Sequence, residues 1–331
     1  MLTDSLRPAE QRERALRLTE PLRVHWETSG DATRLSDALR DADFLVTENE
    51  IPITREILAG AERLRLIQIN GHRCLSVDLE AARALGVAVG TLPLVTSQSV
   101  AEHTLALIFA LARRILPSDR VVRAGSPASA HEPVTVVPGR SFYNWPGLGG
   151  QRLLGGTTLS ILGLGDIGVG VAMRAKALGM EVCYWQRYRI SAAEEAALGL
   201  RYVDFEEAFA VADWLSVHVR FTDETVGLIG EKELALLRPT AFLINTARGP
   251  IVDENALVTA LRDGRLAGAS LDVYWVEPPP ANHALHELEN VVLTPHCAAG
   301  DFETALLEVK AVFDELRDVW QGHPPSYPVT A

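Results

Sequence analysis

Short apolar runs alternate with helix-like stretches along almost the whole chain, and this alternation limits the fold more than any other feature. It is typical of parallel α/β structure, in which a helix returns the chain to the same edge of a sheet after each strand. In the second half of the chain, strands are predicted at residues 158–162, 182–185, 214–219, 241–245, 269–273 and 291–293. Six strands separated by helices predict a complete doubly wound sheet of the dinucleotide-binding type.

The first third of the chain has the same character. Strands are predicted at residues 43–47, 64–69 and 87–90, with a helix at 79–85 between the last two. A length of 331 residues also indicates two domains. The last helix, at 302–320, follows the second set of strands, and we expect it to pack back on the first domain.

Two segments lie between the two sets of strands. A long helix is predicted over residues 97–116, with Ser99 as N-cap and Glu102 completing a capping box. Because it is apolar nearly all round, we expect it to be buried between domains or between subunits. Residues 117–152 contain several prolines and an aromatic cluster at 142–145, which predicts a long ordered loop.

Composition excludes several classes of function. The net charge is −12 and the arginines are scattered, so we expect no nucleic-acid partner. The three cysteines have no C-x-x-C spacing, which predicts neither a disulfide framework nor a metal site and fits a cytoplasmic protein. The start of the chain has no apolar signal core, and the longest apolar run, residues 105–112, is too short to span a bilayer. No membrane partner is therefore expected.

A glycine-rich turn joins the first strand and helix of the second sheet. Its sequence is Gly163-Leu164-Gly165-Asp166-Ile167-Gly168. The first glycine permits the tight turn, the second lets a pyrophosphate approach the backbone, and the third allows close packing of helix on strand. Free N–H groups at the helix N-terminus add positive potential. In this context the turn predicts dinucleotide binding through Gly163, Gly165, Asp166, Ile167 and Gly168, although such turns can also serve packing alone.

The end of the next strand bears on the choice of coenzyme. Gln186 and Arg187 stand there, with Arg189 close behind and no carboxylate. A carboxylate at this place binds the ribose 2′-hydroxyl of NAD, whereas arginine suits the 2′-phosphate of NADP. We therefore predict that Gln186 and Arg187 contact the coenzyme and that NADP(H) is preferred, with NAD(H) as the alternative. The other interpretation is that these arginines are merely solvated.

Four further segments complete a resemblance to a known family. They are Val100-Ala101-Glu102-His103-Thr104, residues 245–254, residues 271–278 and Thr294-Pro295-His296. With the glycine-rich turn, they resemble the D-isomer-specific 2-hydroxyacid dehydrogenases over nearly the whole chain. The resemblance implies a Rossmann-type coenzyme domain, residues 99–296, inserted in a flavodoxin-like substrate domain formed by residues 1–98 and 297–331. It also implies a homodimer.

The residue types suit the chemistry that this resemblance implies, the reduction of a small anionic 2-keto acid such as glyoxylate or hydroxypyruvate. Arg248 can bind a carboxylate in two places and polarise the carbonyl. His296 can give or take the proton, and Glu277 can fix the tautomer of that imidazole. In the alternative interpretation, Arg248 simply pairs with Asp253. A nucleotide-sensing regulatory protein on the same fold is the alternative function.

We also expect coenzyme contacts from Thr104, Val219, Thr246, Ala247 and Asp272. The resemblance implies that Asp272 holds the nicotinamide carboxamide and that Thr104 contacts the coenzyme from the long helix. Asp272 could instead cap its strand end. The formate dehydrogenases that share this fold have Gln where this chain has Glu277, which argues against that activity.

The first domain departs from the family in its substrate loop. Family members carry a Gly-x-Gly loop whose N–H groups receive the substrate carboxylate, whereas this chain has Asn70-Gly71-His72-Arg73. Arg73 thus replaces the second glycine. We expect Gly71, His72 and Arg73 to bind the substrate, with Arg73 narrowing the pocket or binding a second anionic group. The alternative is that Arg73 points to solvent.

Overall fold

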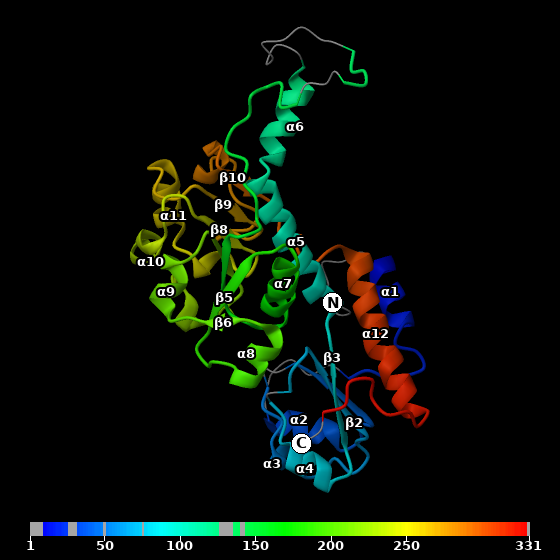
Figure 1. Ribbon diagram of the computed structural model, residues 1–331. Coiled ribbons are helices and arrows are strands. Elements are labelled where there is room, and N and C mark those ends of the chain that lie inside the picture. Colours follow the sequence, from blue (N-terminus) through cyan, green and yellow to red (C-terminus); the bar gives the residue numbers. More distant parts are fainter. Residues whose placement is uncertain are drawn as a thin grey trace. The chain divides into compact units, whose positions relative to one another are not determined.

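A computed structural model of the chain describes residues 9–25, 32–48, 51–74, 76–125, 135–139 and 143–329. The chain divides into two compact units, one combining Met1–Gln98 with Ala299–Ala331 and the other formed by Ser99–Ala298. Each unit has a parallel sheet of its own (Figure 1). The α/β class predicted from the alternating segments is therefore confirmed.

The sheet of the larger unit has the strand order β10-β9-β8-β7-β4-β5-β6, and all neighbouring strands are parallel. The strands are β4 Thr158–Leu162, β5 Glu181–Trp185, β6 Arg201–Tyr202, β7 Trp214–Val217, β8 Phe242–Asn245, β9 Gly268–Leu271 and β10 Val291–Leu293. The sequence predicts all of them except β6, which is too short to show an apolar pattern. Because the strand order reverses beside β4, this sheet has the dinucleotide-binding topology.

Helices cover both faces of the larger sheet, so each face has its own apolar core. The covering helices are α5 Val95–Ala112, α7 Asp166–Ala177, α8 Ala192–Leu198, α9 Phe205–Ala210, α10 Glu231–Leu236 and α11 Glu254–Arg262. Helix α6 Ile115–Ala124 follows α5 and has no buried residue, and the 3₁₀ helices are η2 Asp223–Thr225, η3 Gly249–Ile251 and η4 Ala284–Glu287. Ile108 of α5 and Val171 of α7 belong to one core, whereas Phe209 of α9 and Leu257 of α11 belong to the other. The sheet is therefore doubly wound, as predicted.

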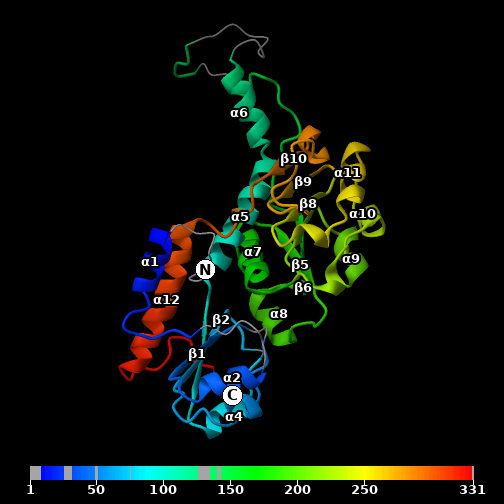
Figure 2. The same cartoon turned by 180° about the vertical axis from the view of Figure 1, so that it is seen from behind.

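The smaller unit has three parallel strands in the order β1-β2-β3. Its elements are α1 Ala9–Arg17, α2 Ala32–Leu39, β1 Phe44–Thr47, α3 Arg55–Leu58, β2 Leu66–Asn70, α4 Leu79–Ala84, β3 Ala88–Leu92 and α12 Phe302–Trp320. Helix α12 has the predicted bounds and packs in this unit, where Phe313 shares a core with Leu66 of β2. It lies beside α1 (Figure 2), and a 2.8 Å ion pair joins Glu303 of α12 to Arg14 of α1.

The predicted capping of the long helix is wrong. Helix α5 begins at Val95, so Ser99 lies inside the helix, and its hydroxyl donates to the carbonyl of Ala298 at 2.9 Å. Glu102 accepts a hydrogen bond from Arg174 of α7 at 3.1 Å instead of closing a box. The helix packs on the larger sheet, where its apolar residues fill part of one of the two cores.

The predicted end of this helix and the loop after it are also corrected. Helix α5 stops at Ala112, and Arg114, at φ 53°, precedes the separate helix α6. Pro117 lies in the first turn of α6, where its missing N–H breaks no helical bond. Residues 126–134 and 140–142 of the predicted loop lie outside the described part of the chain.

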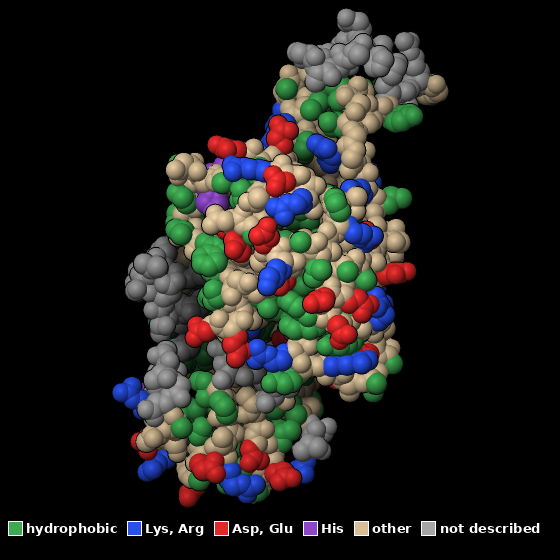
Figure 3. Space-filling view, turned by 90° about the vertical axis from the view of Figure 1, so that its left-hand side faces the viewer, with side chains coloured by type: hydrophobic (Ala, Val, Ile, Leu, Met, Phe, Trp, Pro, Cys, Tyr) green, Lys and Arg blue, Asp and Glu red, His purple; other side chains and the backbone are tan. Residues whose placement is uncertain are grey.

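The surface carries both signs of charge. On the face shown in Figure 3, basic and acidic side chains are interspersed. Among the described residues, no helix is both long and apolar enough to cross a membrane.

Candidate functional site

The carboxyl ends of β7 to β10 lie at one edge of the larger sheet, because these strands are parallel and in register. Leu271, the last residue of β9, pairs with Asn245 of β8 on one side and with Leu293 of β10 on the other. Thr246, Asp272 and Thr294 therefore leave the sheet at the same level. In doubly wound sheets this edge binds ligands.

The glycine-rich turn follows β4 at this edge. Gly163 has φ +95°, and a Cβ there would lie 2.7 Å from the backbone of His218 and Val219. A Cβ on Gly168 would lie 2.3 Å from the carbonyl oxygen of Gly163. Gly165 differs, because it is the N-cap of α7 and a Cβ on it would meet nothing within 4 Å. The first and third glycines are thus required by packing.

The backbone at Gly165 is open to the close approach that a dinucleotide pyrophosphate needs. It adjoins the N-terminus of a twelve-residue helix, whose first residues are Asp166 and Ile167. N–H groups at such a terminus bind anions.

At the end of β5, Gln186 binds to the glycine-rich turn. Its side-chain oxygen accepts from the N–H of Leu164 at 3.2 Å, and its side-chain nitrogen donates to the carbonyl of Tyr188 at 2.6 Å. Arg187 is hydrogen-bonded to the carboxylate of Glu224 in η2, and both side chains are more than half exposed. The sequence missed Glu224, because it stands 37 positions from Arg187 in the chain.

Arg189 is used within the fold. Its guanidinium makes two 2.7 Å bonds to Glu195, which also accepts from the Tyr184 hydroxyl at 2.7 Å. These bonds, from Arg189 first and Tyr184 second, lower the pKa of Glu195 to about 2. Burial and the bond to Glu195 raise the pKa of Tyr184 to about 12. At this strand end, the charge of Arg189 is thus paired within the fold.

Several expected coenzyme residues meet at the same edge. Thr104 of α5 is fully buried, donates to the carbonyl of Val100 at 2.8 Å and lies 2.9 Å from the hydroxyl of Thr246. Val219 lies beside Gly163, after β7. His218, which sequence reasoning missed, is partly buried next to Val219, and burial of its ring lowers its pKa to about 4. Its imidazole is therefore neutral near pH 7.

Asn245, at the end of β8, holds the turn that carries Arg248. Its side-chain oxygen accepts from the N–H of Ala247 and its side-chain nitrogen donates to the carbonyl of Arg248, both at 3.0 Å. The Arg248 guanidinium is exposed and donates to the carbonyl of Ala247 at 2.6 Å. Asp253 instead caps α11 by accepting from Ala256 at 3.0 Å. The arrangement therefore differs from the alternative in which Arg248 pairs with Asp253.

The structure brings Glu277 and His296 together. Nδ1 of His296 lies 2.5 Å from Oε2 of Glu277, and Oε1 of the same carboxylate accepts from the N–H of Tyr274 at 2.9 Å. The backbone of His296 is left-handed, with φ 54°. The imidazole is partly exposed, with 42% of its side-chain surface accessible. The pair thus combines a fixed Nδ1 with an accessible ring.

Asp272 is fully buried and bonds on both sides of the His296 turn. Oδ1 accepts from the Thr294 hydroxyl at 2.5 Å and the Cys297 N–H at 3.0 Å, whereas Oδ2 accepts from the Ala298 N–H at 2.8 Å. These bonds agree with the alternative in which Asp272 caps the end of its strand more directly than with a contact to the coenzyme. Burial, together with the Asp272 charge, raises the pKa of the Cys297 thiol.

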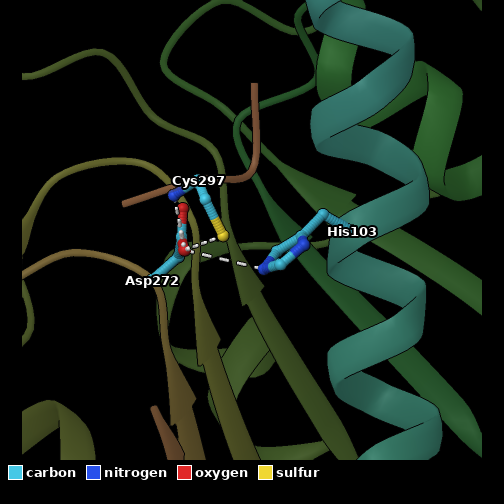
Figure 4. Close-up of side chains that lie close together, drawn as sticks. All are labelled: His103, Asp272 and Cys297. Carbon is cyan, nitrogen blue, oxygen red and sulfur yellow. Dashed lines mark hydrogen bonds and ion pairs between the residues drawn. The ribbon is translucent and has the colours of Figure 1, made fainter. Parts of the chain in front are cut away.

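His103, Asp272 and Cys297 lie around one point, as Figure 4 shows. A ring nitrogen, a carboxylate oxygen and a sulfur lie there within 4.8 Å of one another, a spacing that a small cation could bridge. However, the Thr294 hydroxyl donates to Asp272, so it can only accept from Nε2 of His103, 3.1 Å away. We therefore interpret this cluster as a hydrogen-bonded network rather than as a metal centre.

The predicted substrate loop follows β2 in the smaller unit. Gly71 is buried, and its N–H donates to the carbonyl of Leu92 at 2.8 Å, so this N–H is not directed at a carboxylate. His72 is exposed and Arg73 is partly buried. If this loop receives a substrate carboxylate, His72 and Arg73 must provide the contacts.

Comparison with known proteins agrees with this geometry. Residues 105–298 match the family model of the D-isomer specific 2-hydroxyacid dehydrogenase NAD binding domain. Glyoxylate reductases are similar to the chain, at 41% identity for that of Aeropyrum pernix (88% of this chain, 84% of that one) and 36% for that of Korarchaeum cryptofilum (87% and 83%). A solved glyoxylate reductase from Paecilomyes thermophila has a TM-score of 0.61 at 27% identity, over 96% of this chain and 94% of that one. The chain therefore belongs to the D-isomer-specific 2-hydroxyacid dehydrogenase family and is an NAD(P)-dependent dehydrogenase.

Proposed function

We propose that this dehydrogenase reduces a small 2-keto acid, such as glyoxylate or hydroxypyruvate, to the 2-hydroxy acid. The observation that carries the proposal is the 2.5 Å bond between His296 and Glu277, at the sheet edge that also carries Arg248. The similar glyoxylate reductases support a substrate of this size and charge. Because the similar proteins are glyoxylate reductases, we prefer a catalytic role to that of a nucleotide sensor.

Each residue has a definite task in this reaction. When bound, the nicotinamide supplies a hydride for C2 of the keto acid. Arg248 binds the carboxylate and polarises the carbonyl through its planar guanidinium. His296 gives a proton to the carbonyl oxygen as that oxygen becomes a hydroxyl. Because Nδ1 is bonded to Glu277, the proton leaves from Nε2. Asp272 positions the turn on which His296 stands.

Replacement of Arg248 by alanine tests the carboxylate contact. A hydrogen bond to a charged group contributes about 1.5–3 kcal/mol, so we expect kcat/KM for glyoxylate to fall roughly 10–150-fold. Steady-state kinetics measure this effect. The control is Arg262→Ala on α11, which removes another exposed guanidinium, one that pairs with Glu287 of η4. Equal kinetic constants for the Arg248 variant and the control would remove Arg248 from the mechanism.

The pH dependence tests the pair of Glu277 and His296. Reduction needs a protonated imidazole, and the Glu277 carboxylate stabilises that form. Glu277→Gln removes the charge that faces Nδ1 of His296, so the pH–rate profile of reduction should differ from that of the parent enzyme. His296→Ala should lower turnover by about 10²–10⁴-fold while still binding coenzyme.

A matched control is available for this experiment. Glu254 accepts a similar hydrogen bond from His283, at 2.9 Å, and we assign neither residue a part in the reaction. Glu254→Gln should leave the profile of kcat/KM unchanged. Superimposable profiles for Glu277→Gln and the parent enzyme would contradict the proposed pairing.

For the coenzyme, we propose a preference for NADPH. Support comes from Gln186, which stands where a carboxylate would repel a 2′-phosphate, and from Arg187 beside it. Arg189 makes two bonds to Glu195, whereas Arg187 makes one bond to Glu224, so we assign the phosphate contact at this strand end to Arg187. One charge-assisted hydrogen bond of about 1.5 kcal/mol gives a preference of about tenfold.

Comparison of kcat/KM for NADPH and NADH measures this preference. We expect Arg187→Ala to abolish it, and Gln186→Asp to reverse it, because a carboxylate then faces the 2′-phosphate. Equal or better use of NADH by the parent enzyme would refute the proposal.

We also propose that the enzyme is a homodimer joined through the larger unit. Helix α6 supports this, since it has no buried residues and exposes Ile115, Leu116 and Val122. Exposed apolar groups of this kind commonly mark contact surfaces.

Sedimentation equilibrium should therefore give twice the mass of one chain. Val122→Asp should lower that mass at the same concentration, because it places a charge in the apolar surface of α6. Leu236→Asp, on the exposed part of α10, is the control and should leave the mass unchanged. A single-chain mass for the parent protein would exclude the dimer.

A further inference from the structure

The bond between Arg187 and Glu224 bears on coenzyme selection, and this inference rests on the coenzyme site proposed above. Ion pairs are common on this surface, as with Arg201 and Glu207 at 2.7 Å, so an ion pair alone identifies no site. What distinguishes Arg187 is its position, one residue after Gln186, which is bonded to the glycine-rich turn. The same guanidinium that we assign to the 2′-phosphate is therefore already bonded to a carboxylate.

Glu224 is held at its place by the loop that carries it. The hydroxyl of Thr225 accepts from the N–H of Thr222 at 2.8 Å and donates to the carbonyl of Arg220 at 2.8 Å. These bonds join the last residue of η2 to the backbone that precedes η2. The carboxylate thus belongs to an ordered loop that follows β7, the strand next to β4.

We propose that Glu224 determines coenzyme specificity by competing with the 2′-phosphate for Arg187. A phosphate monoester carries about −1.5 to −2 charges near pH 7, so it must displace Glu224 and bind close to a second negative group. The exposed ion pair is weak enough to open, because both side chains remain largely in water. NADH lacks the 2′-phosphate and meets no such competition. Glu224 therefore reduces the preference for NADPH that Arg187 alone would give.

Binding of two mononucleotides isolates this effect from turnover. Adenosine 2′,5′-diphosphate carries the 2′-phosphate, whereas 5′-AMP lacks it. To bind Arg187, the 2′-phosphate must break the ion pair with Glu224. An ion pair of unit charges about 4 Å apart in water contributes about 1 kcal/mol, which changes an affinity roughly fivefold. Glu224→Gln keeps the size of the side chain and removes its charge. It should therefore tighten binding of the diphosphate about fivefold and leave 5′-AMP unchanged, as measured by isothermal titration calorimetry.

Glu207→Gln is the matched control, because it also removes one charge and one exposed ion pair from the larger unit. It should change neither affinity. The gain in diphosphate affinity from Glu224→Gln should shrink in an Arg187→Ala background, because Glu224 and the 2′-phosphate then have no guanidinium to compete for. An unchanged diphosphate affinity, an equal gain for 5′-AMP, or an undiminished gain without Arg187 would each overturn the proposal.

The proposed function fails in a different way. If the parent enzyme reduced no 2-keto acid with either coenzyme, that proposal would fall, while the mononucleotide titrations would still decide the role of Glu224. If reduction is observed and the titrations show no effect of Glu224→Gln, only the competition is refuted.

Discussion

The register between parallel strands is the constraint on which the candidate site depends. Arg248, Asp272 and His296 all follow strands that end level with one another. Strands β7, β8 and β9 are buried along their whole length, which fixes their positions by packing on both faces. A slip of one residue would move a strand end by about 3.3 Å, which is more than a hydrogen bond tolerates. The precision of the site is thus set by the core of the sheet.

Two buried polar side chains transmit this precision to the turns. Asn245 is 1% exposed and bonds to the backbone of both Ala247 and Arg248. Asp272 is fully buried and bonds to the backbone of Cys297 and Ala298. Each has its bonds satisfied within the protein, as burial of a polar group requires. The exposed Arg248 and His296 are therefore carried on turns that buried groups hold.

Local patterns in the sequence predict much of this arrangement. Apolar runs indicate six of the seven strands of the larger sheet, and the spacing of the glycines indicates the turn after β4. The break between α5 and α6 has no such signal, because it depends on one non-glycine residue, Arg114, with a positive φ. Pairs such as Arg187 with Glu224 escape prediction for another reason. They join loops that become neighbours only when the sheet has formed, and any of many carboxylates could have been the partner.

The left-handed backbone of His296 shows how the site maintains an unfavourable conformation. A non-glycine residue in that region costs of order 1–3 kcal/mol, and it persists only where surrounding bonds determine it. Asp272 provides these bonds, since it accepts from Thr294 before His296 and from Cys297 and Ala298 after it. Glu277 then fixes the ring itself. Because the backbone is held by one carboxylate and the imidazole by another, the position of His296 and its protonation can be altered by separate substitutions.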